Sequence, residues 1–493
     1  MSYLDNKIPV IRELRHPETS LAHGDGHFRG LGGRGCAAVS SRADRSFTQG
    51  SICPLLPALG IMCSLPDTVV LLHGAVGCGT CASGNNANIR AGNAQRGTPG
   101  RDALWLSTAL DELNVINGGN EKLAEAIAEA DRAYKPKVIL AVSGCLPGVI
   151  GDDIDSVAAQ TQERVGARIL PVHCEGFKSR FMATAYDVVY HALGRGLMPD
   201  PAEAPAKAPL TVNVMNVGSM GLADEKELSR LLGRLGLKTN FLPVFTDPES
   251  FKKAAAAALS ISVCPTHDDY FLTHLKEKYG VPYIIRHMPV GVKNTGSWVV
   301  DVGRAMGLED EAKKVVSEEE KELKSALGEF SPVLKGKTAF LSAGEYRSLA
   351  TASLLKELGL RIVGIRSFHF DEFAEVEIKK LAKGKQDFVY NVANVQPFEE
   401  ANILAGLKPD VFLGHWHGNS TAARLGIPAQ VMYNSGHGYM GYAGAYDLAR
   451  RLARRVGHPE FYRRLGRHGR LPYKASWYQS DPFSRIRRGG ATK

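Results

Sequence analysis

The sequence lacks a long, uninterrupted apolar segment of the kind that spans a membrane or directs secretion. Its first twenty residues carry charged side chains within every short apolar run. Of its 493 residues, 44% are hydrophobic and 23% are charged, which is the balance of a folded globular protein and not of a disordered chain. We therefore expect a cytoplasmic protein with no membrane partner and with roughly two to four domains.

Aromatic residues are sparse where the chain is most basic. The net charge of +9 is concentrated towards the C-terminus, in residues 449–470 and again in 484–490. Proteins that bind single-stranded nucleic acid combine such charge with stacking aromatic side chains, and no nucleic-acid-binding motif is present. We expect no nucleic-acid partner and interpret the basic tail as a solvated or partner-facing segment.

A nucleotide-binding motif is also missing. Residues 30–35 (GLGGRG) and 436–441 (GHGYMG) match the dinucleotide pattern, but the first follows no strand pattern. The second is not followed by a strand that carries a ribose-binding acid. The GKT of residues 336–338 has Ser331 where a phosphate loop needs glycine. The sequence predicts that any nucleotide hydrolysis takes place on another protein.

Cysteine is confined to the first 264 residues. In a large cytosolic chain, cysteines are buried thiols, catalytic groups or metal ligands and not disulfide partners. The CGTC of residues 78–81 has the spacing of a zinc knuckle or a redox dithiol. No second pair completes a zinc site, and the redox context is only partly met, so both interpretations are disfavoured.

Strand-like apolar runs alternate with turns and helical patterns along the whole chain. Examples begin at TVVLLHGAVGCG (68–79), KPKVILAVSGCLPG (135–148) and LTVNVMNVGSM (210–220). This alternation predicts an α/β fold with parallel sheets. A Pro/Ala-rich stretch at 196–210 and a charged helix before Lys337 suggest three Rossmann-like domains, at 1–205, 206–330 and 331–493.

Several candidate ligands fall at the carboxyl ends of predicted strands, the edge where parallel sheets bind ligands. They are four cysteines and three histidines: Cys78, Cys145, Cys174, Cys264, His415, His417 and His437. Chance burial would scatter cysteines through strands and helices instead. The pattern therefore predicts a functional site whose ligands come from distant loops.

Five motifs, in order, resemble the D-type (alpha) subunit of nitrogenase component 1. They are GAVGCG (74–79) with Cys53 upstream, SGCLPGVIGDDI (143–154), HCEGF (173–177), SVC (262–264) followed by HLKEKYGVPY, and GYAG (441–444). The resemblance covers nearly the whole chain. It implies three Rossmann-like domains that enclose a metallocluster, and an α2β2 heterotetramer with a K-type (beta) subunit. A separate ATP-dependent 4Fe-4S reductase would supply electrons.

The resemblance also implies a set of cluster ligands. Cys53, Cys78 and Cys145 match the cysteines of a P-cluster-type 8Fe-7S cluster shared with the K subunit, and Cys264 matches the cysteine that holds a large iron–sulfur cofactor of undetermined heterometal. Thiolates are the ligands that iron–sulfur centres require. The remaining cysteines, which have no ligand counterpart and are expected to be buried thiols, are Cys36, Cys63, Cys81 and Cys174.

The departures from nitrogenase concern its reactive face. Tyr186 and Met182 stand where the nitrogen-fixing enzyme has histidine and glutamine, and Asn86 stands where it has arginine. Tyr186 is therefore a candidate proton donor.

The second cofactor ligand is open among three residues of one loop, His437, Asn434 and Tyr433. We favour His437 because imidazole is the better iron ligand. Two further residues, His415 and His417, are candidates for a proton donor or an organic-acid anchor.

Three functions remain open. The motifs look most like the D subunit of methylthio-alkane reductases, which cleave C–S bonds of small organic sulfides such as dimethyl sulfide or 2-(methylthio)ethanol to methanethiol and a hydrocarbon. The second is a scaffold on which nitrogenase cofactor is assembled. The third, an alternative-metal nitrogenase, is the least favoured because the glutamine and histidine are replaced.

Overall fold

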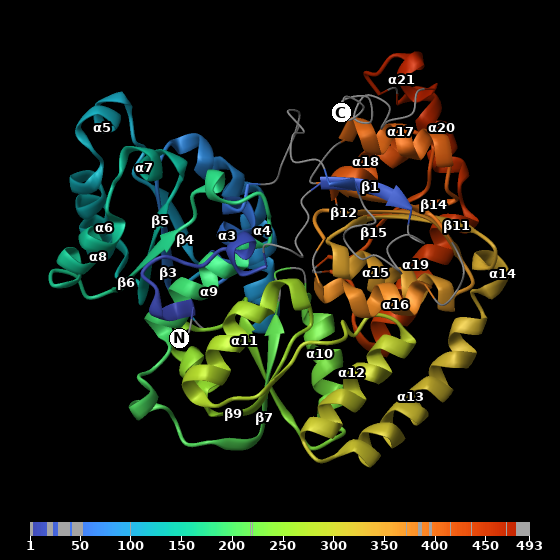
Figure 1. Cartoon of the computed structure of the whole chain (residues 1–493), viewed down its shortest axis with the longest axis horizontal. Coiled ribbons are helices and arrows are strands. Elements are labelled where there is room, and N and C mark those ends of the chain that lie inside the picture. The colour runs from blue at the N-terminus through green and yellow to red at the C-terminus, as the bar shows by residue number, and fades with distance from the viewer. Residues whose placement is uncertain are drawn as a thin grey trace, which may run out of the picture. The chain divides into compact units, whose positions relative to one another are not determined.

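The computed structural model of the chain (Figure 1) describes residues 3–16, 23–27, 40–41, 53–98, 100–216, 218, 220–370, 372–382, 387–393, 397–414, 416–434, 436–469 and 471–479. These residues form two compact units. The first unit comprises the described residues of 1–17, 53–225 and 232–285, and the second comprises those of 18–52, 226–231 and 286–493. Among the described residues, no helix is long and apolar enough to cross a bilayer. The cytoplasmic localisation stays a prediction.

The first unit contains two parallel sheets of four strands each. One has the order β4 (Leu104–Ser107), β3 (Thr68–His73), β5 (Val138–Ser143) and β6 (Arg168–His173). All six residues of β3 and of β5 are buried, as expected for central strands with helices on both faces. The helices of this part are α3 (Leu55–Met62), α4 (Val76–Arg96), α5 (Glu112–Asn117), α6 (Asn120–Tyr134), α7 (Cys145–Ile150), α8 (Ile154–Gln162) and α9 (Thr184–Leu197).

The second sheet of this unit has the order β10 (Tyr283–Ile284), β9 (Ala257–Ile261), β7 (Ala208–Asn216) and β8 (Lys238–Pro243). Helix α11 (Pro265–Tyr279) also belongs to this unit, and α10 (Leu222–Gly233) lies only partly in it, since residues 226–231 belong to the second unit. The stretch predicted as a linker connects α9 to β7 and contains a short 3-10 helix, Pro201–Glu203. The α9 and α11 helices pack together, with the rings of Tyr190 and Phe271 stacked at a centroid distance of 5.2 Å.

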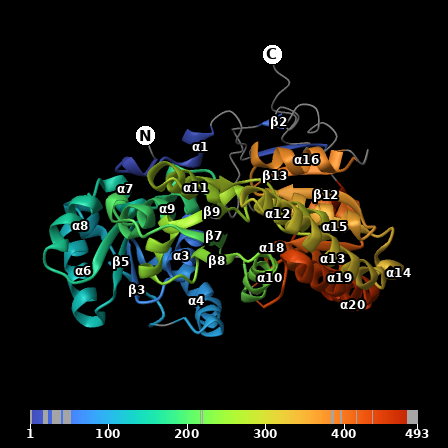
Figure 2. The ribbon, with the colours of Figure 1, turned by 90° about the horizontal axis from the view of Figure 1, so that it is seen from below.

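The second unit is built on a seven-stranded sheet of order β15 (Ala429–Val431), β14 (Val411–Gly414), β11 (Thr338–Ala343), β12 (Arg361–Ser367), β13 (Val389–Ala393), β1 (His23–His27) and β2 (Ser40–Ser41). Figure 2 shows β12 and β13 side by side. The helices of this unit include α12 (Val292–Ala305), α13 (Glu309–Gly328), α15 (Glu345–Glu357), α17 (Pro397–Leu407), α18 (Trp416–Arg424), α19 (Gly441–Gly457) and α20 (Glu460–His468).

The predicted fold class, α/β with parallel sheets, is confirmed. The sequence pattern did not reveal one feature: β1 pairs antiparallel with β13, and β2 pairs antiparallel with β1. The β1 sequence, HGDGH, has no apolar run, so its strand depends on an available sheet edge and not on its own pattern. The domain boundaries proposed from composition stay a prediction.

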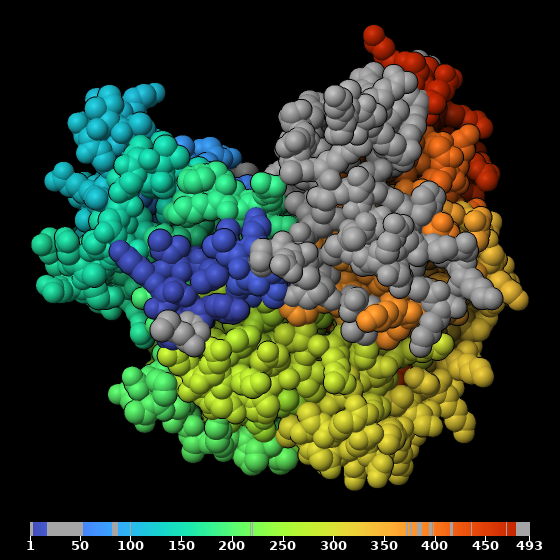
Figure 3. Space-filling model, in the orientation of Figure 1, coloured from blue at the N-terminus to red at the C-terminus, as the bar shows by residue number. Residues whose placement is uncertain are grey.

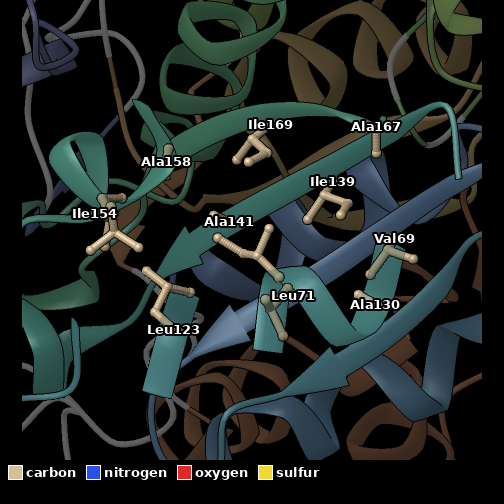
Figure 4. Packing of buried hydrophobic residues seen from close by; sticks show 12 residues of the cluster. Val69, Leu71, Leu123, Ala130, Ile139, Ala141, Ile154, Ala158, Ala167 and Ile169 are labelled. Carbon is tan, nitrogen blue, oxygen red and sulfur yellow. The ribbon is translucent and has the colours of Figure 1, made fainter. Parts of the chain in front are cut away.

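The best-defined core of the first unit lies between the first sheet and helices α6 and α8 (Figure 4). Leu71 from β3 and Ile139 from β5 point into it, and Leu123 and Ile127 come from α6. Leu123 and Ile127 are four residues apart, so both lie on the same helix face. This core fixes the first sheet, whose carboxyl edge carries two of the candidate ligand cysteines.

Leu123→Ala removes a fully buried side chain from this core. We expect it to lower the free energy of unfolding by about 2–5 kcal/mol, because it creates a cavity as well as losing apolar burial. Urea denaturation followed by circular dichroism measures this difference. Leu113→Ala on α5, where the side chain is 68% exposed, is the matched control and should change it by less than about 0.5 kcal/mol. Equal effects of the two substitutions would contradict the core assignment.

Candidate functional site

Parallel pairing places two candidate ligands at one sheet edge. The pairing of β3 with β5 sets His73 opposite Ser143, and the backbone N–H of Gly144 donates to the His73 carbonyl at 3.0 Å. Cys78 lies in the first turn of α4, and Cys145 is the first residue of α7. Both cysteines therefore leave the carboxyl edge of neighbouring strands, as the sequence predicted.

Cys53 reaches the same place from the segment before α3. A Cβ built on Gly176 would lie 2.5 Å from Cys53 Sγ and 3.6 Å from Cys145 Sγ. The two sulfurs thus share a space that only glycine at position 176 leaves open. Cys53 is exposed, and Cys78 and Cys145 are partly exposed. Thiols that converge at the surface suit a cluster whose other ligands come from a second chain.

A second glycine brings Cys78 close to the sheet. Gly79, next to Cys78 in α4, lies under the Trp105 ring of β4, and a Cβ on Gly79 would meet that ring at 2.1 Å. The GCG motif therefore allows a close approach of helix and strand. This contact between helix and strand depends on the glycine at position 79 and not on the two-residue spacing between Cys78 and Cys81. The side chain of Cys81, further along α4, lies outside the described part, as does that of Asn86.

A buried histidine ties the two cysteine-bearing segments together. His73 Nδ1 lies 3.1 Å from Thr108 Oγ1, and its Nε2 lies 3.0 Å from Asp152 Oδ2, in the turn that follows α7. Burial lowers the pKa of His73, although Asp152 opposes the shift. With a partner on each ring nitrogen, His73 fixes the loop after β3 against the segment after Cys145.

An ion cluster fixes the end of the neighbouring strand β6. His173 Nε2 lies 2.7 Å from Asp155 Oδ2, and Lys178 Nζ lies 3.1 Å from Glu175 Oε2. Burial would lower the pKa of His173, but hydrogen bonds to Asp155 and Glu175 raise it to about 9. These contacts flank Gly176 in the chain: the first joins the HCEGF segment to α8, and the second lies between residues 175 and 178.

The two other described cysteines, Cys63 and Cys174, are both buried. Burial raises the pKa of Cys63 to about 12. Burial also raises the pKa of Cys174 well above its ordinary value, with neighbouring Cys53, Glu175 and Cys145 adding to the shift. Because the thiolate is the ligand form, such thiols are poor ligands unless a metal deprotonates them. Cys36 lies outside the described residues.

Cys264 caps the start of α11 at the carboxyl end of β9, and its side chain is buried. The Asp268 carboxylate accepts hydrogen bonds from the backbone N–H groups of Cys264 and Val263, both at 3.2 Å, and from Ser262 Oγ at 2.7 Å. Burial raises the pKa of Asp268 to about 7, and these three bonds oppose the shift. The carboxylate braces the turn that presents the cysteine.

Aromatic side chains lie one helical turn from Cys264. The backbone N–H of His267 donates to the Cys264 carbonyl at 2.9 Å, and the His267 ring stacks on Tyr186 at a centroid distance of 3.8 Å and an angle of 6°. Phe181, just before α9, is buried as well. Sequence reasoning singled out Tyr186 but missed His267, which stands three residues after a strand-ending cysteine and so shares its helix face.

In the second unit, the loop between β15 and α19 carries the candidate second ligand. His437 is exposed on this loop, and Asn434 Oδ1 accepts from the backbone N–H of Gly436 at 2.9 Å. Tyr433 lies in the same loop. Glu227 Oε1 accepts from the backbone N–H groups of Tyr442 and Ala443, both at 3.1 Å, and so fixes the start of α19.

A buried arginine, missed by the sequence analysis, supports this loop. The Arg347 guanidinium lies 4.2 Å from the ring centroid of Tyr433 and 5.1 Å from that of Tyr439. Tyr439 also bonds Thr351, with 2.6 Å between their hydroxyl oxygens. Arg347 lies in the first turn of α15, the helix that follows the carboxyl end of β11, and this position could have flagged it. His415 lies outside the described residues, and the side chain of His417 is not described.

The described residues hold no group of three or more His, Cys, Asp or Glu arranged for a single metal ion. Thiolates of an iron–sulfur cluster bind different iron atoms, so their sulfurs need not meet around one ion. The donor set around Gly176 is made of thiols, which fits iron–sulfur ligation.

Residues 53–456 match the family model described as nitrogenase component 1 type oxidoreductase. The chain belongs to this family. It is 27% identical over 369 residues to the nitrogenase molybdenum-iron protein alpha chain of Methanosarcina barkeri, covering 72% of this chain and 68% of that one. It is 28% identical over 428 residues to the nitrogenase iron-molybdenum cofactor biosynthesis protein NifE of Methanococcus maripaludis, covering 83% and 84%.

A solved structure, nitrogenase Cp1 at pH 5, shares the fold with a TM-score of 0.71 and 21% identity, over 88% of this chain and 92% of that one. As a nitrogenase component 1 type oxidoreductase, the chain has the predicted family and fold. Family membership also supports the prediction of iron–sulfur clusters, whereas their types and the ligand roles of single residues stay predictions.

Gly176→Ala should lower the iron content of the assembled protein, because the added methyl group enters the space between two candidate ligand sulfurs. Iron per chain and the circular dichroism spectrum measure cluster and fold separately. Gly233→Ala is the matched control, since its Cβ would meet nothing within 4 Å. Full iron content in Gly176→Ala would mean that the sulfurs around Gly176 do not hold a cluster.

Proposed function

We propose that this chain is the catalytic D-type subunit of a nitrogenase-like reductase that cleaves C–S bonds in small methylthio-alkanes. The observation that carries the proposal is the aromatic surrounding of Cys264: Tyr186 stacks on His267, one helical turn from the cysteine. A thioether carries no charge and has no acidic proton, so its pocket needs apolar and polarisable walls. Met182, Phe181 and Tyr186 provide such side chains in one segment.

The proposed reaction consumes two electrons and two protons. The C–S bond breaks, one hydrogen ends on carbon to give a hydrocarbon, and the other ends on sulfur to give methanethiol. Bound iron–sulfur groups supply the electrons when reduced by an ATP-dependent 4Fe-4S reductase. The role of this chain is to position the substrate and deliver a proton. The Tyr186 hydroxyl, on a buried side chain of α9, is the proposed donor.

Cys264 and His437 are the proposed ligands of the large iron–sulfur cofactor, and Cys53, Cys78 and Cys145 are those of the 8Fe-7S cluster shared with a K-type subunit. The exposure of Cys53 supports sharing, because a lone chain leaves that thiol in water. His415 and His417 stay candidates for proton delivery or substrate anchoring. The heterometal of the cofactor is not specified by these residues.

An exposed apolar patch supports docking of a separate electron donor. Ile116 and Leu113 on α5 are 78% and 68% exposed, and Val149 on α7 is 72% exposed. Solvent-exposed clusters of large apolar side chains mark protein contacts. Because α7 begins at Cys145, a reductase bound to α5 and α7 would lie beside the proposed shared cluster.

A cofactor-assembly scaffold is the second candidate. Several relatives that bear the NifE name match across more than 80% of both chains, so the comparisons support a scaffold as well as an enzyme. A scaffold releases its cluster to another protein and needs no sustained turnover. An assay for sustained turnover therefore distinguishes the two functions.

With its K-type partner, the reductase, ATP and dimethyl sulfide, the protein should release methanethiol over many turnovers and reduce dinitrogen poorly or not at all. Gas chromatography measures both products. Tyr186→Phe should slow methanethiol release by about 100-fold or more, because it removes the proposed proton donor. Tyr279→Phe is the control, since its hydroxyl bonds the Pro199 carbonyl at the far end of α11.

Two results would contradict the enzyme proposal. One is a fully metallated complex that does not cleave thioethers but transfers its cluster to cofactor-free nitrogenase, which would favour the scaffold. The other is unchanged turnover in Tyr186→Phe, which would mean that Tyr186 shapes the pocket but donates no proton.

A further inference from the structure

The N-terminal residues 3–16 lie on α9 and α11, the helices that carry Tyr186 and follow Cys264. In Figure 3 these dark-blue residues cover green and yellow-green parts of the first unit. Arg195 donates to the Lys7 carbonyl at 2.8 Å from α9, and the Val10 N–H donates to the Tyr270 hydroxyl of α11 at 3.4 Å. The segment therefore touches both helices.

Arg15 bridges the two helices by its guanidinium. One nitrogen donates to Asp187 Oδ1 of α9 at 2.8 Å, and another donates to Asp269 Oδ2 of α11. The Arg15 side chain is 1% exposed, and the Asp187 side chain is fully buried. Without a cation between them, two buried carboxylates on facing helices would repel each other. The planar fork of arginine can bond both at once, which the single ammonium of lysine cannot do in the same geometry.

The arginine charges act on the pKa values of both carboxylates of this bridge. Burial alone would raise the pKa of Asp269, but a hydrogen bond from His16 and the charges of Arg12 and Arg15 hold it well below its usual range. Burial raises the pKa of Asp187, and the charge of Arg15 opposes the shift. The Arg15 cation also lies 5.0 Å from the ring centroid of Tyr270.

The Arg15 bridge contacts residues that are close in sequence to the stacked pair, Tyr186 and His267. Asp187 follows Tyr186 directly, and Asp269 stands two residues after His267. Arg12, also fully buried, donates to the Thr266 carbonyl at 2.8 Å, one residue before His267. The stack of Tyr186 on His267 is therefore fixed from both helices by the same short segment of chain.

We propose that Arg15 is a positioning residue: by joining Asp187 to Asp269 it holds Tyr186 over His267 and sets the tyrosine hydroxyl relative to Cys264. This inference rests on the proposed role of Tyr186 as proton donor. Arg15 itself touches no proposed ligand or substrate. It acts through the relative position of two helices, and the N-terminal segment thereby becomes part of the reaction apparatus.

Arg15→Lys tests the inference because it keeps the charge but loses the fork. In the cofactor-free chain with 13C-labelled histidine, the His267 ring protons should be shifted upfield by the Tyr186 ring, and Arg15→Lys should reduce that shift. His267→Gln assigns the signal. Arg195→Lys is the matched control, because it makes the same exchange on α9 at a contact with the same segment and should leave the His267 signal unchanged.

Turnover provides the second measurement. In the assembled complex with dimethyl sulfide, Arg15→Lys should lower kcat by up to about 100-fold with little change in KM, since a small displacement of a reacting group has that cost. Arg195→Lys should keep its kcat. In the Tyr186→Phe background, Arg15→Lys should cost no further turnover, because no hydroxyl remains to be misplaced. A general loss of folding would lower activity in both backgrounds.

An unshifted His267 signal together with unchanged kcat in Arg15→Lys would overturn the inference, and so would an equal loss of kcat with and without the Tyr186 hydroxyl. The His267 signal could move in Arg15→Lys while even the wild-type complex releases no methanethiol. That result would support the positioning of the stack by Arg15 and contradict the proposed reaction. Should Arg15→Lys fail to fold, Asp187→Asn makes the same test, since it keeps the side-chain shape and removes one carboxylate from the bridge.

Discussion

The parallel pairing of β3 with β5 is the constraint on which the candidate cluster site depends. With His73 opposite Ser143, the loops that follow both strands leave the same edge, and Cys78 and Cys145 are delivered together although 66 positions separate them in the sequence. His73, bonded to Thr108 and Asp152, prevents the two loops from separating. Gly176 then leaves the space that the sulfurs of Cys53 and Cys145 share.

Around Cys264 a different constraint operates, because a cysteine that caps a helix must be held by the residues that follow it. Asp268 holds the backbone of that turn, and the Tyr186–His267 stack lies against it. The arginines of the N-terminal segment fix these helices by buried charge. Buried ion pairs of this kind are costly unless fully paired, so they often serve specificity of arrangement more than stability.

The fold was accessible from the sequence because β3 and β5 are buried apolar runs followed by glycine turns, the pattern expected of strands in a sheet covered on both faces. Strand β1 was not predicted, because HGDGH gains its partner only at the edge of a parallel sheet whose strands lie more than 300 positions away in the sequence. The candidate ligand cysteines could be named from motifs. His267 and Arg347 could not, because a stack on Tyr186 and a cation over Tyr433 arise only from tertiary packing.

The central claim is that Cys53, Cys78 and Cys145 form one half of a cluster site completed by a second subunit. Iron and acid-labile sulfide per chain, measured for this protein purified alone and with its K-type partner, test it most directly. The account predicts little iron in the lone chain and a stable cluster in the pair, which Cys145→Ala would abolish. A lone chain that retains the full iron content of the pair would contradict the shared site.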